Sequence, residues 1–271
     1  KRRLSEQELL GFVDDNVYGV IAGLEPYTNR GFQKASNLKV ISRCGTGLDN
    51  VDTIVAEKNK IKVFNTPNAP VIAVAELTVA LIMNVIRKVQ LSHSSINKGQ
   101  WIRPKGILLK DKTIGIIGYG KIGKKVSQYL RALGAKIVIH DILIQPDNLS
   151  YFNFEKLLEI SDIVTIHIPY NENYHHLFNS KAFKSFKDGA YLINTSRGEL
   201  INEEALYEAL NSGKLSGAAL DVFEKEPYDG RLVKLDNTLL TAHIGSYAKE
   251  ARLIQEIESV TNLMRGLKIW E

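Results

Sequence analysis

The chain has 271 residues, of which 44% are apolar and 24% are charged, a composition typical of a globular protein with room for two modest domains. Its formal charge of +5 comes from lysine and arginine scattered along the chain rather than clustered with aromatic residues, so no nucleic-acid partner is expected. The single cysteine, Cys44, excludes an intrachain disulfide and favours an intracellular, cytoplasmic protein. The most apolar stretch, residues 71–86, is interrupted by Glu76 and Asn84 and is shorter than the ~20 residues of a membrane span, so no membrane association is expected.

Short helices and strands alternate over the first part of the chain. Ser5 and Glu8 have the spacing of a capping box, which predicts a short helix through Val13. Strands are expected at residues 17–22, 38–42 and 61–64, with helices at 28–35 and 50–59. This alternation indicates βα units on a parallel sheet. Because a helix comes before the first strand, either a leading strand precedes residue 1 or the unit is built differently.

A turn with two prolines, residues 66–70, follows this first unit and is the expected crossing between domains. Residues 71–97 then predict one long helix that is apolar on too many sides for a surface helix. It should therefore lie buried between layers or against another subunit. A final helix at about 248–265 is expected to return to the first unit. The predicted domains are residues 1–68 with 246–271, and residues 69–245.

Residues 113–141 have the pattern of a dinucleotide-binding unit. An apolar run leads into Gly118, Gly120 and Gly123, an amphipathic helix closes at Gly134, and a second apolar run ends in Asp141. The first glycine allows a tight turn, the second lets the backbone approach a pyrophosphate, and the third lets helix and strand pack closely. An ordinary glycine turn is the alternative, but the flanking strand and helix favour the dinucleotide site.

Asp141 also indicates which dinucleotide is bound. A carboxylate at the end of the second strand accepts hydrogen bonds from the adenosine ribose and repels a 2′-phosphate, so NAD is expected rather than NADP. Lys121, Lys124 and Lys125 are interpreted as a solvated helix face rather than a phosphate clamp.

Further strands are expected at residues 136–140, 163–168, 190–195, 217–222 and 238–242, with a short polar connection around residues 145–148. Together with the strand at 113–117 they predict an α/β fold with a doubly wound parallel sheet, the Rossmann architecture. Ligands of such sheets bind outside the carboxyl ends of the strands.

Three side chains at these strand ends could carry out hydride-transfer chemistry on a keto acid. Arg197 offers a planar fork for a carboxylate, and His243 could protonate the carbonyl oxygen. Glu226 could hold the tautomer of His243 and keep it protonated. Taken singly, Arg197 could form a surface ion pair, Glu226 could be a solvated loop residue, and His243 could be a hydrogen-bonded polar residue. Their occurrence at successive strand ends favours catalysis.

The other histidines are interpreted differently. His167 ends a strand and is expected to line the cofactor site. His175 and His176 lie in a polar loop and are expected to be solvated, with no third ligand at metal spacing, so no metal site is predicted.

Six stretches carry a resemblance to a known family: ISRCGTGLDNVD, FNTPN with AELTVALIM, TIGIIGYGKIG, INTSRGELINEEAL, GAALDVFEKEP and LLTAHIGSYAKEA. They resemble the D-isomer-specific 2-hydroxyacid dehydrogenases. The resemblance implies a Rossmann domain inserted into a smaller, flavodoxin-like α/β substrate domain, and a homodimer or homotetramer with the helix after Pro70 in the subunit contact. It also implies that Arg197, Glu226 and His243 are the catalytic residues.

The resemblance implies further contacts. The expected cofactor contacts, besides the glycines, Asp141 and His167, are Thr46, Lys121, Ile122, Ile168, Pro169, Thr195, Ser196, Arg197, Asp221, His243 and Gly245. The expected substrate contacts are Cys44, Gly45, Thr46 and Gly47 through the backbone of their loop, Arg43 as a possible phosphate partner, Arg197 and His243.

Within the family, the branch that acts on 3-phosphoglycerate in serine biosynthesis is the most similar. That branch usually has a basic, phosphate-binding residue after the strand corresponding to residues 17–22, where this chain has Gly23, Leu24 and Glu25. The alternatives are another small 2-keto acid, such as hydroxypyruvate or glyoxylate, and a non-catalytic, NAD(H)-sensing protein similar to the corepressors of this superfamily.

Overall fold

The computed structural model describes residues 4–143 and 150–269. It divides into two compact units, Lys1–Ala73 with Ser246–Glu271, and Val74–Gly245. The second unit thus begins inside the helix that follows the proline-rich turn. The polar connection expected around residues 145–148 lies outside the described residues.

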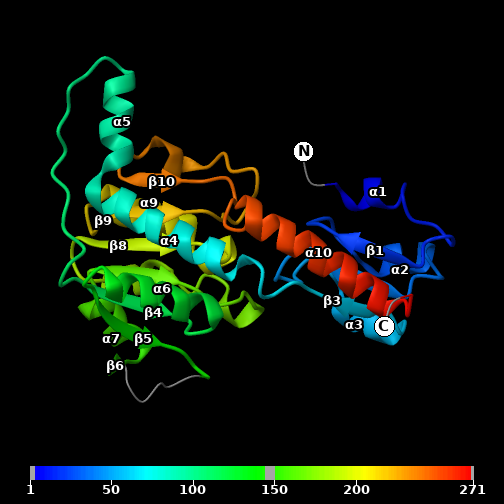
Figure 1. The fold of residues 1–271 in the computed structure, drawn as a ribbon. Coiled ribbons are helices and arrows are strands. Elements are labelled where there is room, and N and C mark those ends of the chain that lie inside the picture. Colours follow the sequence, from blue (N-terminus) through cyan, green and yellow to red (C-terminus); the bar gives the residue numbers. More distant parts are fainter. Residues whose placement is uncertain (1–3, 144–149, 270–271) are drawn as a thin grey trace. The chain divides into compact units, whose positions relative to one another are not determined.

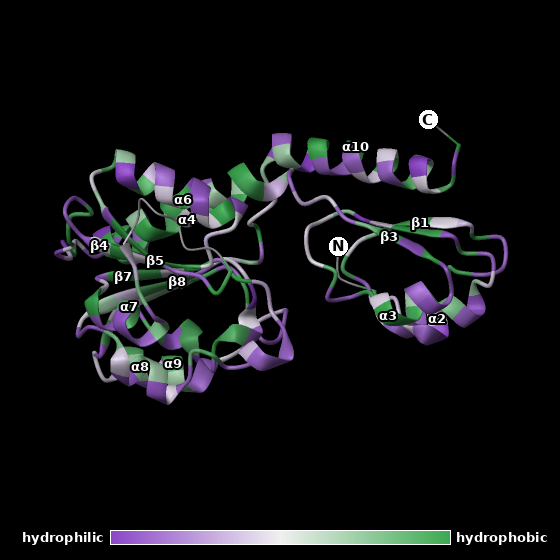
Figure 2. Ribbon diagram, turned by 90° about the horizontal axis from the view of Figure 1, so that it is seen from below, coloured by the Kyte–Doolittle hydropathy of each residue, from purple (hydrophilic) through white to green (hydrophobic). Residues whose placement is uncertain are grey.

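The first unit is a small parallel sheet with helices on both faces. Its strands β1 (Gly19–Ala22), β2 (Val40–Arg43) and β3 (Lys62–Phe64) pair in that order. Helices α2 (Asn29–Lys34) and α3 (Thr53–Lys58) cover one face and α10 (Lys249–Gly266) covers the other (Figures 1 and 2). The predicted capping box is confirmed at Ser5, but α1 (Glu6–Leu9) ends four residues before Val13.

Close packing fastens α10 to this sheet. A Cβ atom on Gly266 would lie 2.8 Å from Val40, and one on Gly19 would lie 2.6 Å from Leu263. Because neither position has room for a side chain, the helix backbone approaches β2 and the β1 backbone approaches the helix. The last helix of the chain is therefore a layer of the unit that the first residues begin.

The second unit contains a seven-stranded, entirely parallel sheet, which confirms the predicted fold class. The strand order is β10-β9-β8-β7-β4-β5-β6. Six strands correspond to the predictions, while β6, of two residues, was not predicted because it is too short to show a pattern. The bounds are β4 (Thr113–Ile117), β5 (Lys136–His140), β6 (Ser150–Tyr151), β7 (Ile163–Ile166), β8 (Ala190–Asn194), β9 (Leu215–Leu220) and β10 (Thr238–Leu240).

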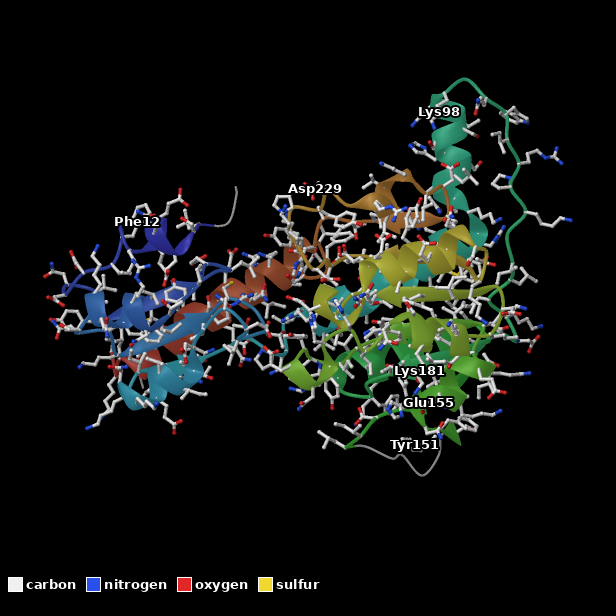
Figure 3. The ribbon with its side chains drawn as sticks, turned by 180° about the vertical axis from the view of Figure 1, so that it is seen from behind. Phe12, Lys98, Tyr151, Glu155, Lys181 and Asp229 are labelled. Carbon is white, nitrogen blue, oxygen red and sulfur yellow. The ribbon has the colours of Figure 1, made fainter. Side chains whose placement is uncertain are left out.

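Helices cover both faces of this sheet. On one face lie α4 (Pro70–Arg87) and α6 (Lys121–Ala132), and on the other α7 (Phe154–Ile160), α8 (Ser180–Ser185) and α9 (Glu203–Asn211) (Figure 2). A separate apolar core fills each side. Charged side chains such as Glu155 and Lys181 remain on the outer surface of α7 and α8 (Figure 3).

The prediction of a single helix over residues 71–97 was wrong. The helix breaks at Lys88, whose φ is 54°, and continues as α5 (Val89–Asn97). The amide of Ile107 donates to the Ile86 carbonyl at 2.9 Å, and a Cβ on Gly106 would lie 2.5 Å from that oxygen. The chain returning after α5 thus takes a carbonyl that a continuous helix would have used.

Helix α4 has the length and apolar composition of a membrane-crossing segment. Half of it is buried within the fold, and Leu81, Ile82, Val85 and Ile86 belong to the core beneath α6. Packing on the sheet accounts for its apolar character, because a helix buried in a core is apolar on several sides.

Candidate active site

The glycine-rich turn between β4 and α6 has the shape that its spacing predicts. Gly118 has a φ of 92°, and a Cβ there would lie 2.5 Å from the His167 carbonyl oxygen. A Cβ on Gly123 would lie 2.1 Å from the Gly118 oxygen, whereas one on Gly120 would meet no atom within 4 Å. Packing therefore requires glycine at positions 118 and 123. Gly120 leaves open space at the helix N-terminus, where a pyrophosphate would bind.

Asp141 follows β5 beside this turn. Its Oδ2 accepts from the Tyr119 amide at 2.6 Å, and its Oδ1 accepts from the Leu143 amide at 2.8 Å. The glycine-rich turn thus holds the Asp141 carboxylate in place through the Tyr119 amide. Lys121 and Lys124 are exposed, Ile122 is half-buried, and Lys124 lies over the Tyr119 ring at 5.7 Å.

The ends of β7 and β8 meet beside the glycine turn. The His167 amide donates to the Ile117 carbonyl at 2.7 Å, and the Ser196 hydroxyl donates to the Ile168 carbonyl at 2.8 Å. Burial lowers the pKa of the His167 imidazole to about 3, so the ring is neutral at physiological pH. Pro169 is exposed at this edge.

Arg197 is held by its own loop. Its Nη1 donates to the Ser196 carbonyl at 2.7 Å, and the Asn194 amide group donates to the Arg197 carbonyl at 2.8 Å. The buried Thr195 hydroxyl lies 2.9 Å from that of Thr78, which itself donates to the Val74 carbonyl. These contacts tie the β8 end to α4.

The structure brings His243 and Glu226 together. The His243 Nδ1 lies 2.9 Å from Glu226 Oε2 and 3.1 Å from Oε1, and the Phe223 amide donates to Oε1 at 3.3 Å. Partial burial by itself would raise the pKa of the Glu226 carboxyl, but the hydrogen bond and charge of His243, the Phe223 amide and the charge of Arg197 outweigh it and lower this pKa. Glu226 is therefore ionised, and its contact with the imidazole of His243 is made through Nδ1.

Asp221 organises the loop that carries His243. The residue is 1% exposed, and its carboxylate accepts from the Thr241 hydroxyl at 2.6 Å and from the Ile244 and Gly245 amides at 2.9 and 2.8 Å. Its own carbonyl accepts from the His243 amide at 2.9 Å. These bonds hold His243 at a φ of 53°, a conformation that costs energy for a residue other than glycine.

The expected substrate loop lies in the first unit, after β2. The Cys44 amide donates to the Ala22 carbonyl and the Gly45 amide to the Arg43 carbonyl, both at 2.9 Å. The amides of Cys44 and Gly45 thus hold the loop to β1 and to the end of β2. Arg43 is 8% exposed, and its guanidinium lies against Gly45 and bonds to the Cys44 carbonyl.

The interpretation of both loop histidines as solvated was wrong for His176. His175 is exposed, but His176 is half-buried, stacks on His175 with 3.9 Å between ring centroids, and lies 3.1 Å from Glu224. Sequence spacing could not predict the contact between His176 and Glu224, because His176 follows β7 and Glu224 follows β9. Among residues 4–143 and 150–269, no group of three or more His, Cys, Asp or Glu side chains could hold a metal ion.

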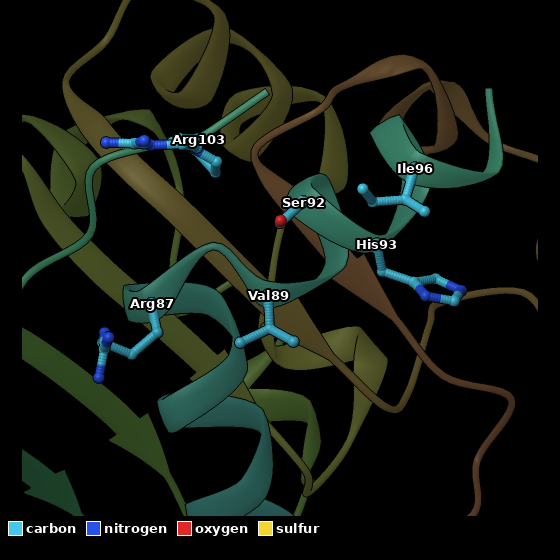
Figure 4. Close-up of a pocket in the computed structure, with 7 residues that line it drawn as sticks. Arg87, Val89, Ser92, His93, Ile96 and Arg103 are labelled. Atoms are coloured by element: carbon cyan, nitrogen blue, oxygen red, sulfur yellow. The ribbon is translucent and has the colours of Figure 1, made fainter. Parts of the chain in front are cut away.

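A separate open pocket of about 440 Å³ lies beside α5, lined by residues that include Arg87, His93 and Arg103 (Figure 4). None of the predicted site residues lines it. The glycine turn and the Glu226–His243 pair carry the chemical groups that the predicted reaction needs, so we place the candidate site there.

A parallel doubly wound sheet with this glycine turn defines a dinucleotide-binding protein. Residues 79–245 match the family described as D-isomer specific 2-hydroxyacid dehydrogenase, NAD binding domain. The chain belongs to the D-isomer-specific 2-hydroxyacid dehydrogenase family and carries its NAD-binding domain, which confirms the resemblance and the predicted cofactor.

Relatives in this family carry different substrate names. The chain is 35% identical to a D-3-phosphoglycerate dehydrogenase of Archaeoglobus fulgidus, over 99% of this chain and 53% of the relative. It is 36% identical to a hydroxypyruvate reductase of Thermotoga maritima, over 98% of this chain and 90% of the relative. The crystal structure of the TT0316 protein from Thermus thermophilus superimposes with a TM-score of 0.92 at 35% identity, covering 98% of this chain and 88% of that one. The chain thus spans about half the length of the phosphoglycerate dehydrogenase it matches.

Some structural residues of the site were not singled out from the sequence. They are Thr78, Asn194, Gly198 and Thr241. Asn194 and Thr241 each stand at the end of a predicted strand, and a polar residue at such a place could have been flagged. Thr78 lies within an apolar helix, where nothing in the pattern marks it.

Proposed function

We propose that this protein is an NAD-dependent oxidoreductase that interconverts a small D-2-hydroxy acid and its 2-keto acid. The observation that carries the proposal is the contact of His243 with Glu226 in the unit that holds the NAD-binding turn. When bound, NADH supplies a hydride to the carbonyl carbon of the keto acid. Every other part of the reaction falls to side chains of this chain.

Arg197 binds the substrate carboxylate with its planar fork. His243 donates the Nε2 proton to the carbonyl oxygen as it becomes a hydroxyl, and takes it back in the oxidation direction. Glu226 holds Nδ1–H, which orients the ring and stabilises the imidazolium. Such general acid catalysis contributes roughly two to four powers of ten in rate.

The 3-phosphoglycerate and 3-phosphohydroxypyruvate pair, in serine biosynthesis in the cytoplasm, is the first substrate candidate, on the strength of the sequence resemblance and of the names of several relatives. A homodimer or homotetramer is part of this proposal.

A specific observation favours a second candidate, hydroxypyruvate or glyoxylate. Glu25 Oε1 accepts from the Gly23 amide at 2.8 Å and from the Tyr27 hydroxyl at 3.2 Å, so a carboxylate stands after β1 where a phosphate would need a cation.

One experiment separates these possibilities. Steady-state oxidation of NADH is measured with 3-phosphohydroxypyruvate, hydroxypyruvate, glyoxylate and pyruvate. Turnover of any of them supports the dehydrogenase, and the ratio of kcat/KM values identifies the substrate. If the protein binds NADH but turns over none of the four keto acids, the result would instead favour an NAD(H)-sensing, corepressor-like protein.

A further inference from the structure

A second histidine–glutamate pair, His176 with Glu224, shares the loop after β9 with the proposed catalytic pair. Glu224 precedes Glu226 by two residues on the loop that follows β9, and its Oε1 lies 3.1 Å from His176 Nε2 on the loop that follows β7. Their side chains are 33% and 29% exposed, so the contact is shielded from water on most sides. Neither residue has a role in the reaction proposed above.

Glu224 also exchanges hydrogen bonds with the start of α9. Its amide donates to Glu203 Oε1 at 2.9 Å, and the Glu203 amide donates to Glu224 Oε1 at 3.3 Å. Glu203 is the first residue of α9, and its amide is one of those that a helix leaves without an internal partner. The exchange therefore ties the loop carrying Glu226 to the helix that follows Arg197.

Asn202 completes the contact from the other side. Its Oδ1 accepts from the Ala205 amide at 2.8 Å, which turns its amide nitrogen toward His176 Nδ1 at 3.3 Å. The His176 Nε2 lies 3.1 Å from Glu224 Oε1, a close contact that lacks the geometry of a hydrogen bond. The His176 amide donates to the Glu199 carbonyl at 2.9 Å, which ties its loop to the segment after Arg197.

The backbone leaves no space between these loops. A Cβ on Gly198, the residue after Arg197, would lie 1.9 Å from the Phe223 carbonyl carbon and 2.4 Å from the Glu224 nitrogen. The loops bearing Arg197 and Glu226 are thus in direct backbone contact. The two hydrogen bonds between Glu203 and Glu224 add a second connection between the same segments.

From this geometry we infer that Glu224, together with His176 and Glu203, is a positioning element that fixes Glu226 relative to Arg197 and so aims His243. Glu224 acts through the backbone of its loop and touches no reacting atom. The inference rests on the proposed function where it is tested by kcat. It is also tested by the order of the loop at residues 223–226, a measurement that does not depend on catalysis.

The test compares Glu224→Ala and Glu224→Gln with Glu155→Ala, a matched control that removes an exposed glutamate from the first turn of α7 (Figure 3). We expect Glu224→Ala to lower kcat by about ten- to a hundredfold, the cost of a small misplacement of catalytic groups. NADH affinity stays unchanged, and the alkaline limb of the pH profile moves to lower pH because His243 loses a firmly held partner. Glu224→Gln, which keeps an acceptor for the Glu203 amide, loses less.

A merely structural role would lower kcat equally at every pH. That outcome, or an unchanged kcat in Glu224→Ala, overturns the inference. Should Glu224→Ala fail to fold, the pH profile of Glu224→Gln decides in the same way.

Hydrogen exchange at residues 223–226 provides the readout that does not need turnover. Faster exchange in Glu224→Ala than in wild type and the control supports the inference, and equal exchange overturns it. If wild type turns over no 2-keto acid, the proposed function fails, and hydrogen exchange still decides whether this cluster orders the loop.

Discussion

Replacing Glu226 by glutamine tests the role of the His243–Glu226 contact. A glutamine has one acceptor oxygen, and the Phe223 amide and the His243 Nδ1–H would compete for it. A hydrogen bond between charged partners contributes ~1.5–3 kcal/mol, and exposure to water reduces this toward the lower part of the range. Since the two side chains are 38% and 34% exposed, we take about 2 kcal/mol, which corresponds to about thirtyfold in rate.

The assay follows NADH absorbance during reduction of the best keto acid, across the pH range. We expect kcat/KM to fall about thirtyfold at neutral pH, the alkaline limb to move to lower pH, and NADH binding to stay the same. Asp229→Asn is the control, because Asp229 lies on the same segment and its side chain is 82% exposed. A Glu226→Gln enzyme with unchanged kcat/KM and pH profile would refute the reasoning.

Three further predictions follow from the NAD-binding turn and its neighbours. Gly123→Ala forces a Cβ to 2.1 Å from the Gly118 oxygen and should lower the free energy of unfolding by ~1–3 kcal/mol in urea titrations, whereas Gly120→Ala should unfold like wild type but bind NADH more weakly; equal stability of the two variants would contradict the packing argument. Asp141→Ala should weaken NADH binding and reduce the preference for NADH over NADPH, which titration calorimetry measures; an unchanged ratio of affinities would exclude ribose recognition by Asp141. The pKa of His167 in the folded protein, about 3, lies below the ~6.5 of an unfolded histidine. Between these values the unfolded chain binds the additional proton, so stability is fully present above that window and falls by up to about 1.4 kcal/mol per pH unit as the pH decreases through it; His167→Asn should flatten this dependence in denaturant titrations, and an equally steep curve would contradict the assignment.

Local patterns were enough to predict the centre of the NAD-binding unit. Strands β4 and β5 have the predicted bounds, and Gly134, at a φ of 85°, closes α6 as expected. The reason is that backbone conformation, helix periodicity and close approach at a glycine turn are properties of neighbouring residues. The fold class follows from the same local signals, since alternating strands and helices have few parallel arrangements.

Contacts between distant segments decided the rest. The long apolar helix ends at Arg87 because Gly106 and Ile107 return to its last turn, and no pattern within residues 71–97 contains that information. Likewise, the Asp221 carboxylate accepts hydrogen bonds from the Thr241 hydroxyl and the Ile244 and Gly245 amides, which no pattern around residue 221 predicts. His176 and Glu224 are in contact because the loops that follow β7, β8 and β9 pack against one another. Sequence alone therefore determined which residue types stand at the strand ends, and tertiary structure decided which of them touch, because those contacts depend on chain segments that fold back from elsewhere.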